Sequence, residues 1–204
     1  MDPSSDRNDV DERMEGLTVA ACQRCPALVE SRSRIVNGVG DPDAELLFVG
    51  EGPGEQEDTE GEPFVGRSGS VLTDTLQEQG LARSDVRITN CVRCRPPDNR
   101  DPSDDELRNC RPYLEAEIER IDPTAIIALG KVPSEHLLGR SVGVTNEAGT
   151  IETVEIAGYQ RDVLISVHPA ASLYDPSQRT TFEQVIEKAA SMVGSGDQST
   201  LGQF

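Results

Sequence analysis

The chain has 204 residues, and its formal net charge of −18 at pH 7 would ordinarily argue against a nucleic-acid partner. Lys131 and Lys188 are the only lysines among the 19 basic residues, and an acidic, lysine-poor composition of this kind is typical of hosts that live in high salt. No apolar run is long enough to span a membrane, and the N-terminus lacks the basic and apolar regions of a signal peptide, so we expect a cytoplasmic monomer with no membrane partner.

Both ends of the chain are polar. Residues 1–17 are acidic and poor in apolar side chains, and residues 194–204 are rich in Gly, Ser and Gln, so we expect a disordered tail at each end. Residues 18–193 are long enough to form one domain with its own core.

Five cysteines follow in order: Cys22, Cys25, Cys91, Cys94 and Cys110. An odd number in a chain without export signals argues against a disulfide framework. The C-x-x-C spacing of Cys22 and Cys25 is typical of metal ligands, while Cys94 and Cys110 are separated by a basic loop and a helix. Four thiolates suit zinc or a 4Fe-4S cluster; the alternative is that these cysteines are small buried hydrophobes or incidental surface thiols.

Residues 45–69 form the central stretch of the chain. Residues 45–49 are an apolar run without helical spacing, which predicts a strand buried on both faces and ended by Gly50. Residues 52–54, Gly-Pro-Gly, allow a sharp turn at the carboxyl end of that strand, where parallel sheets bind ligands. No Gly-Lys-Ser/Thr follows, so this is not a P-loop. Phe64 stands between turn residues, where an aromatic ring is costly unless it stacks on something; the alternative is an acidic surface turn.

The remaining pattern alternates strands and helices. We predict helices over 68–80, 131–138 and 179–193, a helix opened by the Ser103–Glu106 capping box and running through Ile118, strands over 86–89, 124–129 and 163–167, and an antiparallel hairpin within 142–162. This alternation predicts a three-layer α/β/α fold with a central four-stranded parallel sheet and a small extra hairpin. Right-handed crossovers would bring the loops after the strands to one edge, which collects Glu51, Gly52, Glu57, Phe64, Asn90 and His168.

Several short blocks, in a specific order, resemble the family-four uracil-DNA glycosylases over about residues 22–193. The blocks are Cys22-x-x-Cys25, GEGPGEQED from Gly50, EPFVG ending at Gly66, ITNCVRCRPPDNR from Ile88, Cys110, and His168-Pro-Ala170. The resemblance implies a base excision repair enzyme that hydrolyses the N-glycosidic bond of uracil in DNA and leaves an abasic site. It also implies a 4Fe-4S cluster held by Cys22, Cys25, Cys94 and Cys110, with Cys91 outside the pattern.

The same resemblance implies roles for the residues at the sheet edge. Asn90 would read the edge of uracil, because one amide can serve both the O4 acceptor and the N3–H donor. Phe64 would stack on the base, and Glu57 would close the pocket at C5 against the methyl group of thymine. His168 would lie at O2, where negative charge develops as the bond breaks. Glu51 and Gly52 match the loop that handles water.

This chain departs from the family pattern at two places. Better-known uracil glycosylases have an aspartate where this chain has Gly52, so Glu51, the backbone or the substrate phosphate must position water. After His168-Pro169 the family usually continues with larger apolar residues and an arginine, whereas here residues 170–174 read AASLY. Leu173 or Tyr174 would then fill the stack that the extruded base leaves.

The basic loop suggests how an acidic chain could hold DNA. Arg93, Arg95 and Arg100 surround Cys94 and predict a local DNA-binding patch; the alternative is that they pair with the abundant carboxylates. A different function would be a non-catalytic iron–sulfur or zinc DNA-binding module. A glycosylase that is trapped covalently on its product ranks last, because relatives of that kind carry an added histidine-containing loop that this chain lacks after Cys94.

Overall fold

The centre of the protein is a run of buried apolar strands. In the computed structural model, which describes residues 14–193, β4 (Leu46–Gly50) is buried along its whole length. It pairs in parallel with β5 (Arg87–Asn90) on one side and with β6 (Ala125–Leu129) on the other, and β6 pairs in parallel with β8 (Tyr159–Ser166). The predicted four-stranded parallel core is therefore confirmed.

Two antiparallel edge strands extend this core into a six-stranded mixed sheet of order β3-β5-β4-β6-β8-β7. β3 (Val39–Gly40) pairs with β5, and β7 (Ile151–Ile156) pairs with β8. The predicted hairpin is thus wrong in its extent: its second strand is the core strand β8 itself, and the segment before it contains the short helix α7 (Val144–Glu147).

The polar ends are only partly described. Residues 1–13 and 194–204 lie outside the described residues, so the predicted C-terminal tail and most of the N-terminal one stay predictions. At the end of the stretch predicted as the first tail, β1 (Met14–Glu15) pairs with β2 (Thr18–Val19), and Met14 and Val19 pack against Tyr113. Strands of two residues are too short to leave a periodic signal.

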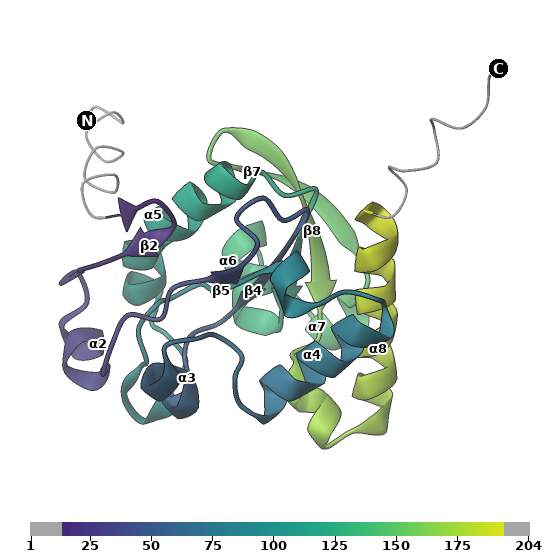
Figure 1. Ribbon diagram of the computed structural model, residues 1–204, viewed down its shortest axis with the longest axis horizontal. Coiled ribbons are helices and arrows are strands. Elements are labelled where there is room, and N and C mark those ends of the chain that lie inside the picture. The colour runs from purple at the N-terminus through teal and green to yellow at the C-terminus, as the bar shows by residue number, and fades with distance from the viewer. Residues whose placement is uncertain (1–13, 194–204) are drawn as a thin grey trace.

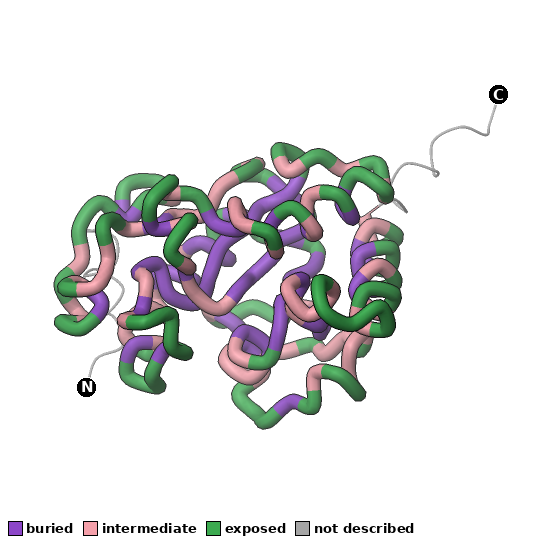
Figure 2. The backbone as a smooth tube through the Cα atoms, turned by 90° about the horizontal axis from the view of Figure 1, so that it is seen from below, coloured by how far each residue is buried: buried purple, intermediate pink, exposed green. Residues whose placement is uncertain are grey.

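Helices cover both faces of the sheet. They are α2 (Pro26–Ser31), α3 (Glu55–Glu60), α4 (Arg67–Glu78), α5 (Asp104–Ile121), α6 (Lys131–Leu138) and α8 (Pro176–Val193), with single 3₁₀ turns η1 (Arg83–Asp85), η2 (Pro97–Asn99) and η3 (Pro169–Leu173). Figure 1 shows α4 beside α8, and their apolar side chains join Leu46 and Phe48 in one core cluster. α5 and α6 pack with Leu47 and Val49 on the opposite face, because successive residues of a strand point to opposite sides. Figure 2 shows the buried strands enclosed by partly exposed helices.

The parallel strands end at one edge of the sheet. Gly50 of β4 is paired with Asn90 of β5, and Leu129 of β6 with Ser166 of β8, so the loops that follow these residues lie together. The Ser103 hydroxyl accepts a hydrogen bond from the Glu106 amide at 3.3 Å, which confirms the predicted start of α5. Within residues 14–193, no helix is long and apolar enough to cross a membrane.

Candidate functional site

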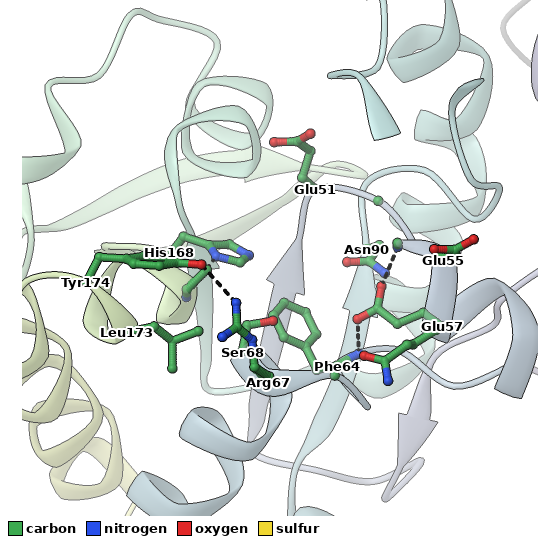
Figure 3. A pocket seen from close by; sticks show the side chains of 15 residues that line it. Glu51, Glu55, Glu57, Phe64, Arg67, Ser68, Asn90, His168, Leu173 and Tyr174 are labelled. Atoms are coloured by element: carbon green, nitrogen blue, oxygen red, sulfur yellow. Dashed lines mark hydrogen bonds between the residues drawn. The ribbon is translucent and has the colours of Figure 1, made fainter. Parts of the chain in front are cut away.

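A pocket of about 520 Å³ lies at the carboxyl ends of the parallel strands (Figure 3). Its lining includes all six residues predicted for this edge: Glu51, Gly52, Glu57, Phe64, Asn90 and His168. Leu173 and Tyr174 of the segment after His168 also line it, and so does Arg67 at the start of α4, which the sequence had not singled out. The topology thus brings together residues from four separate segments of the chain.

Phe64 is held in an unusual conformation at the floor of this pocket. Its φ of 57° lies in the left-handed region, which costs a non-glycine residue about 1–3 kcal/mol. Two glycines make the position possible. A Cβ on Gly50 would lie 2.6 Å from the ring, and a Cβ on Gly69 would overlap the Phe64 carbonyl oxygen. The ring is therefore seated on the backbone of β4 and is only 4% exposed.

Glu57 holds the loop that carries Phe64. Its Oε1 accepts a hydrogen bond from the Phe64 amide at 2.5 Å, and its Oε2 accepts one from the Gly54 amide at 2.8 Å. Burial raises the pKa of this carboxyl. Glu57 belongs to helix α3, which was not predicted from the sequence. One sequence feature could have predicted the helix: Glu57 is the third residue of α3, and its side chain accepts a hydrogen bond from the amide of the N-cap residue Gly54.

Asn90 presents an unpaired amide to the pocket. It ends β5 and is 3% exposed, and within the described residues its buried Nδ2 has no hydrogen-bond partner. Buried polar groups are nearly always paired in folded proteins, so a lone amide in a pocket wall is a candidate ligand contact. The Asn90 Oδ1 lies so close to Gly50 that a side chain at position 50 would displace it.

His168 offers a neutral imidazole. It precedes η3, where its Nδ1 accepts a hydrogen bond from the Ala170 amide at 3.1 Å. Burial lowers the pKa of the ring to about 4, so the imidazole is neutral near pH 7. With Nδ1 acting as acceptor, the single proton of a neutral ring is on Nε2, which can therefore donate into the pocket.

Glu51 and Gly52 stand where β4 leaves the sheet. Burial, with a smaller contribution from repulsion by Asp101, raises the pKa of Glu51 to about 7. Figure 3 shows its carboxylate directed away from Phe64. A Cβ on Gly52 would lie 2.7 Å from Val92 Cγ2, so an acidic side chain at position 52 would require Val92 to move. This contact explains why position 52 is a glycine in this chain and not the aspartate discussed above.

Four of the five cysteines line one cavity, and the fifth lies elsewhere. Cys22, Cys25, Cys94 and Cys110 line one small cavity between α2, the loop after β5, and α5. Arg32 Nη1 donates to Cys94 Sγ at 2.8 Å, and Asn109 Nδ2 donates to Cys25 Sγ at 3.5 Å. In the part of the chain that is described, no three His, Cys, Asp or Glu side chains meet in a way that would hold a single metal ion.

Cys91 lies apart from that cavity. It is fully buried in the core cluster under α5, with Leu114 and Ile118, and burial raises the pKa of its thiol. Cys91 thus behaves as a small apolar core residue.

The basic loop differs from its prediction. The assignment of Arg93 to DNA binding is wrong, because Arg93 is 2% exposed and its Nη2 lies 2.6 Å from Oε2 of the buried Glu117. Arg100 pairs bidentately with Glu106, at 2.7 and 2.8 Å, which supports the alternative of carboxylate pairing. Arg95 instead donates to the neutral Asn99 side chain at 2.8 Å and lies 3.8 Å from the exposed Glu55. Arg95 is thus the best candidate of the three for contact with phosphate.

Comparisons with known proteins place the chain in a family. Residues 37–190 match the model of the uracil DNA glycosylase superfamily. The chain is 44% identical over 184 residues to a type-4 uracil-DNA glycosylase of Saccharolobus solfataricus, which covers 87% of this chain and 84% of that protein. It is 38% identical over 180 residues to a protein of the same name from Archaeoglobus fulgidus, covering 86% and 90%. A type-5 uracil-DNA glycosylase of Thermus thermophilus is 34% identical over 152 residues, covering 59% and 69%.

Proposed function

The chain belongs to the uracil DNA glycosylase superfamily, and we propose that it is a DNA repair enzyme that hydrolyses the N-glycosidic bond of uracil in DNA and leaves an abasic site. The observation that carries this proposal is the unpaired amide of Asn90 in the pocket that Phe64 lines. A glycosylase must extrude its target nucleotide, stack the base and read its edge by hydrogen bonds. A stacking ring next to an unsatisfied amide meets both requirements.

Asn90 would discriminate uracil from cytosine. Its Nδ2 donates to uracil O4 and its Oδ1 accepts from N3–H. Cytosine carries an amine in place of O4 and an acceptor at N3, so both contacts become unfavourable. Rejection of a partner with mismatched hydrogen bonds is strong, since the buried groups of the site stay unpaired.

Glu57 would act against thymine. The backbone amides of Gly54 and Phe64 hold its carboxylate in place, so the side chain would resist moving aside to admit a methyl group at C5. The same two bonds fix the loop from Gly54 to Phe64, which makes this wall of the pocket rigid.

His168 would stabilise the departing base. When the N-glycosidic bond breaks, negative charge develops on uracil O2, and a fixed donor at that point lowers the barrier. The Nε2–H of the neutral imidazole is such a donor, because the Ala170 amide occupies the other ring nitrogen. A neutral donor avoids placing a buried cation in the empty pocket.

Glu51 would activate water. A general base works best when its pKa is close to the working pH, and burial brings the pKa of Glu51 to about 7. Gly52 adds no side chain beside Glu51, and a side chain at that position would require Val92 to move. The water then attacks C1′ as the sugar gains positive character.

We further propose that Cys22, Cys25, Cys94 and Cys110 hold a 4Fe-4S cluster. The fit rests on four thiols that line one cavity and come from three segments of the chain. Four thiolates suit a 4Fe-4S cluster, and zinc is the alternative occupant of the same ligand set. The cluster would supply a structural cross-link among α2, the loop after β5, and α5.

We assign contact with DNA to Arg95 and to two exposed residues that line the pocket, Leu173 and Tyr174. Arg95 is the loop arginine with the weakest carboxylate pairing. Leu173 and Tyr174 are two of the three exposed large hydrophobic residues within residues 14–193, and both line the pocket. Apolar side chains at such a rim can enter the base stack when a nucleotide leaves it.

One experiment separates this enzyme from a non-catalytic DNA-binding module. Purified protein is incubated in high salt with labelled oligonucleotides that carry uracil, thymine or cytosine at one position, and abasic sites are then cleaved with alkali. We expect a strand break only at uracil. Binding without any break would identify a module that grips DNA but performs no chemistry.

A further inference from the structure

A chain of contacts joins the cysteine cavity to the pocket by way of α2 and α3. It begins at Arg32, directly after α2, whose Nη1 donates to Cys94 Sγ at 2.8 Å and whose Nη2 donates to the Cys22 carbonyl at 2.7 Å. The backbone that follows, residues 32–34, is here called the strap. Arg32, at one end of the strap, is therefore hydrogen-bonded to Cys22 and Cys94.

The other side of the strap is held by Asp58 of α3. Asp58 is 2% exposed, and its two oxygens accept hydrogen bonds from the Ser33 amide at 2.8 and 2.9 Å. Oδ1 also accepts a hydrogen bond from the Arg34 amide at 3.3 Å. A Cβ on Gly61, at the end of α3, would lie 3.1 Å from the Arg34 side chain, so the strap also packs against the end of the helix. A buried carboxylate bound by backbone amides is strongly fixed, since any movement would leave it unsatisfied.

Asp58 is next to Glu57, which controls the stacking ring. Glu57 accepts hydrogen bonds from the amides of Gly54 and Phe64, at the two ends of the loop. Phe64 keeps its left-handed backbone only while surrounding contacts hold it there. The position of α3, and so of Asp58, decides whether those contacts can form.

We propose that Asp58 is a positioning residue for uracil recognition: by holding α3 to the strap, it keeps Glu57 and Phe64 in the geometry that stacks the base, and it links that geometry to the cysteine site. The inference rests on the proposed function for its meaning in catalysis. The link itself is a matter of backbone contacts and can be tested without any substrate.

The test is hydrogen exchange of individual amides in the metal-loaded protein. In Asp58→Asn, one of the two acceptor oxygens becomes an NH₂ group and the negative charge is lost, so the hydrogen bonds from the Ser33 and Arg34 amides weaken. Exchange at Ser33 and Arg34 should rise, and exchange at Gly54 and Phe64 should rise with it, by about tenfold or more. Amides of the core strands β4 and β6 should keep their exchange rates. Iron content should stay that of the wild type. Uracil excision should show a raised KM, because the stacking ring is no longer held in place.

Two further variants serve as a control and as a second test. Glu60→Gln changes an exposed carboxylate on the same helix and should leave all these amides unchanged. Ser33→Pro removes one donor from the opposite side of the contact, and the extended conformation of Arg32 accepts a following proline. It should reproduce the faster exchange at Gly54 and Phe64 if Asp58→Asn does not fold.

Three outcomes overturn the proposal. Faster exchange at Ser33 and Arg34 alone would show that α3 does not transmit the change to the pocket. Faster exchange throughout the sheet would show that Asp58 serves general stability. An unchanged KM in Asp58→Asn, together with faster exchange at Phe64, would show that Asp58 has no role in uracil recognition. If the wild type excises no uracil, the proposed function fails, while the exchange pattern still decides whether Asp58 holds the loop.

Discussion

The ring of Phe64 lies 5.9 Å from the imidazole of His168, between centroids, and their planes are inclined by 31°. Phe64 lies between α3 and α4, and His168 follows β8; both line the pocket at the edge where the parallel strands end. A base stacked on Phe64 would therefore present one edge to the His168 Nε2–H and another to Asn90. In the proposed reaction, stacking and polarisation of the same base would depend on this pair.

Replacement of Asn90 by Asp should abolish the reading of uracil. The change puts an acceptor opposite O4 in place of the unpaired Nδ2, so excision should fall by about a hundredfold or more in kcat/KM. Kinetics on a uracil oligonucleotide measure the loss, and the thermal unfolding midpoint shows whether the fold is kept. Full activity in this variant would remove Asn90 from the pocket's chemistry.

The pH profile should report Glu51. Its pKa of about 7 means that the carboxylate is increasingly protonated below that pH, so kcat/KM should fall about tenfold per pH unit on the acid side. His168, with a pKa of about 4, adds no change between pH 5 and 9. Glu51→Gln should be slow at every pH and should lack the acid limb. An unchanged limb in that variant would assign it to another group.

The Glu51 carboxyl should make stability fall as pH rises, whereas it should make activity rise. The folded-state pKa of Glu51 is raised above its ordinary value of 4.5, so folding favours the protonated form, and stability declines as pH rises from about 4.5 through about 7. Glu51→Gln should therefore unfold at a higher temperature than the wild type at pH 8, and at a similar temperature at pH 4.

The cysteines should separate into ligands and a core residue. Protein purified without oxygen should be brown, and Cys94→Ala or Cys110→Ala should lose both colour and stability. Cys91→Ala is the matched control: it should keep the colour and lose only about 1 kcal/mol, because it opens a small cavity in the core. Metal analysis decides between occupants, since stoichiometric zinc without iron would reject the cluster and keep the four ligands.

The loop arginines should differ in their effect on DNA. Arg95→Gln should weaken DNA binding and lower the salt dependence of log Kd by about one unit, because one phosphate contact is lost. Arg100→Gln should leave DNA affinity nearly unchanged, since that side chain is already engaged by Glu106. Titrations of binding against salt concentration make the comparison. Equal losses in the two variants would show that the pairing with Glu106 opens when DNA binds.

The core strands, and the residues that meet at the edge where the pocket lies, could be predicted from the sequence because the signals for them are local. Runs such as residues 124–129 are continuously apolar, and each strand end is marked by a turn residue or by His168-Pro169. Helix α3 was missed because residues 55–60 carry no apolar periodicity, and tertiary contacts of Glu57 and Asp58 hold the helix. The burial of Arg93 depends on Glu117, which lies 24 positions further along the chain on α5, and no local pattern predicts such a pairing.

The segment after His168 contains the side chain best placed to fill the vacated stack. Tyr174 is 76% exposed, lines the pocket, and receives a hydrogen bond on its hydroxyl from Arg67 Nη2 at 2.9 Å. Figure 3 shows this bond crossing from η3 toward the start of α4. Leu173 is smaller and only 38% exposed. An exposed aromatic ring, steadied at its tip, is better suited than Leu173 to enter a base stack.

Tyr174→Ala should therefore slow excision of uracil paired in a duplex by about tenfold or more, since stacking of a base on an aromatic ring contributes about 1–3 kcal/mol. Excision from a single strand should fall less, because less stacking must be replaced there. Tyr174→Phe keeps the ring and loses the bond to Arg67, so it should retain most of the duplex activity. Tyr159→Ala, which removes another exposed tyrosine on β8 outside the pocket, is the matched control and should behave as the wild type. An equal loss on both substrates in Tyr174→Ala would show that this ring shapes the pocket and does not enter the stack.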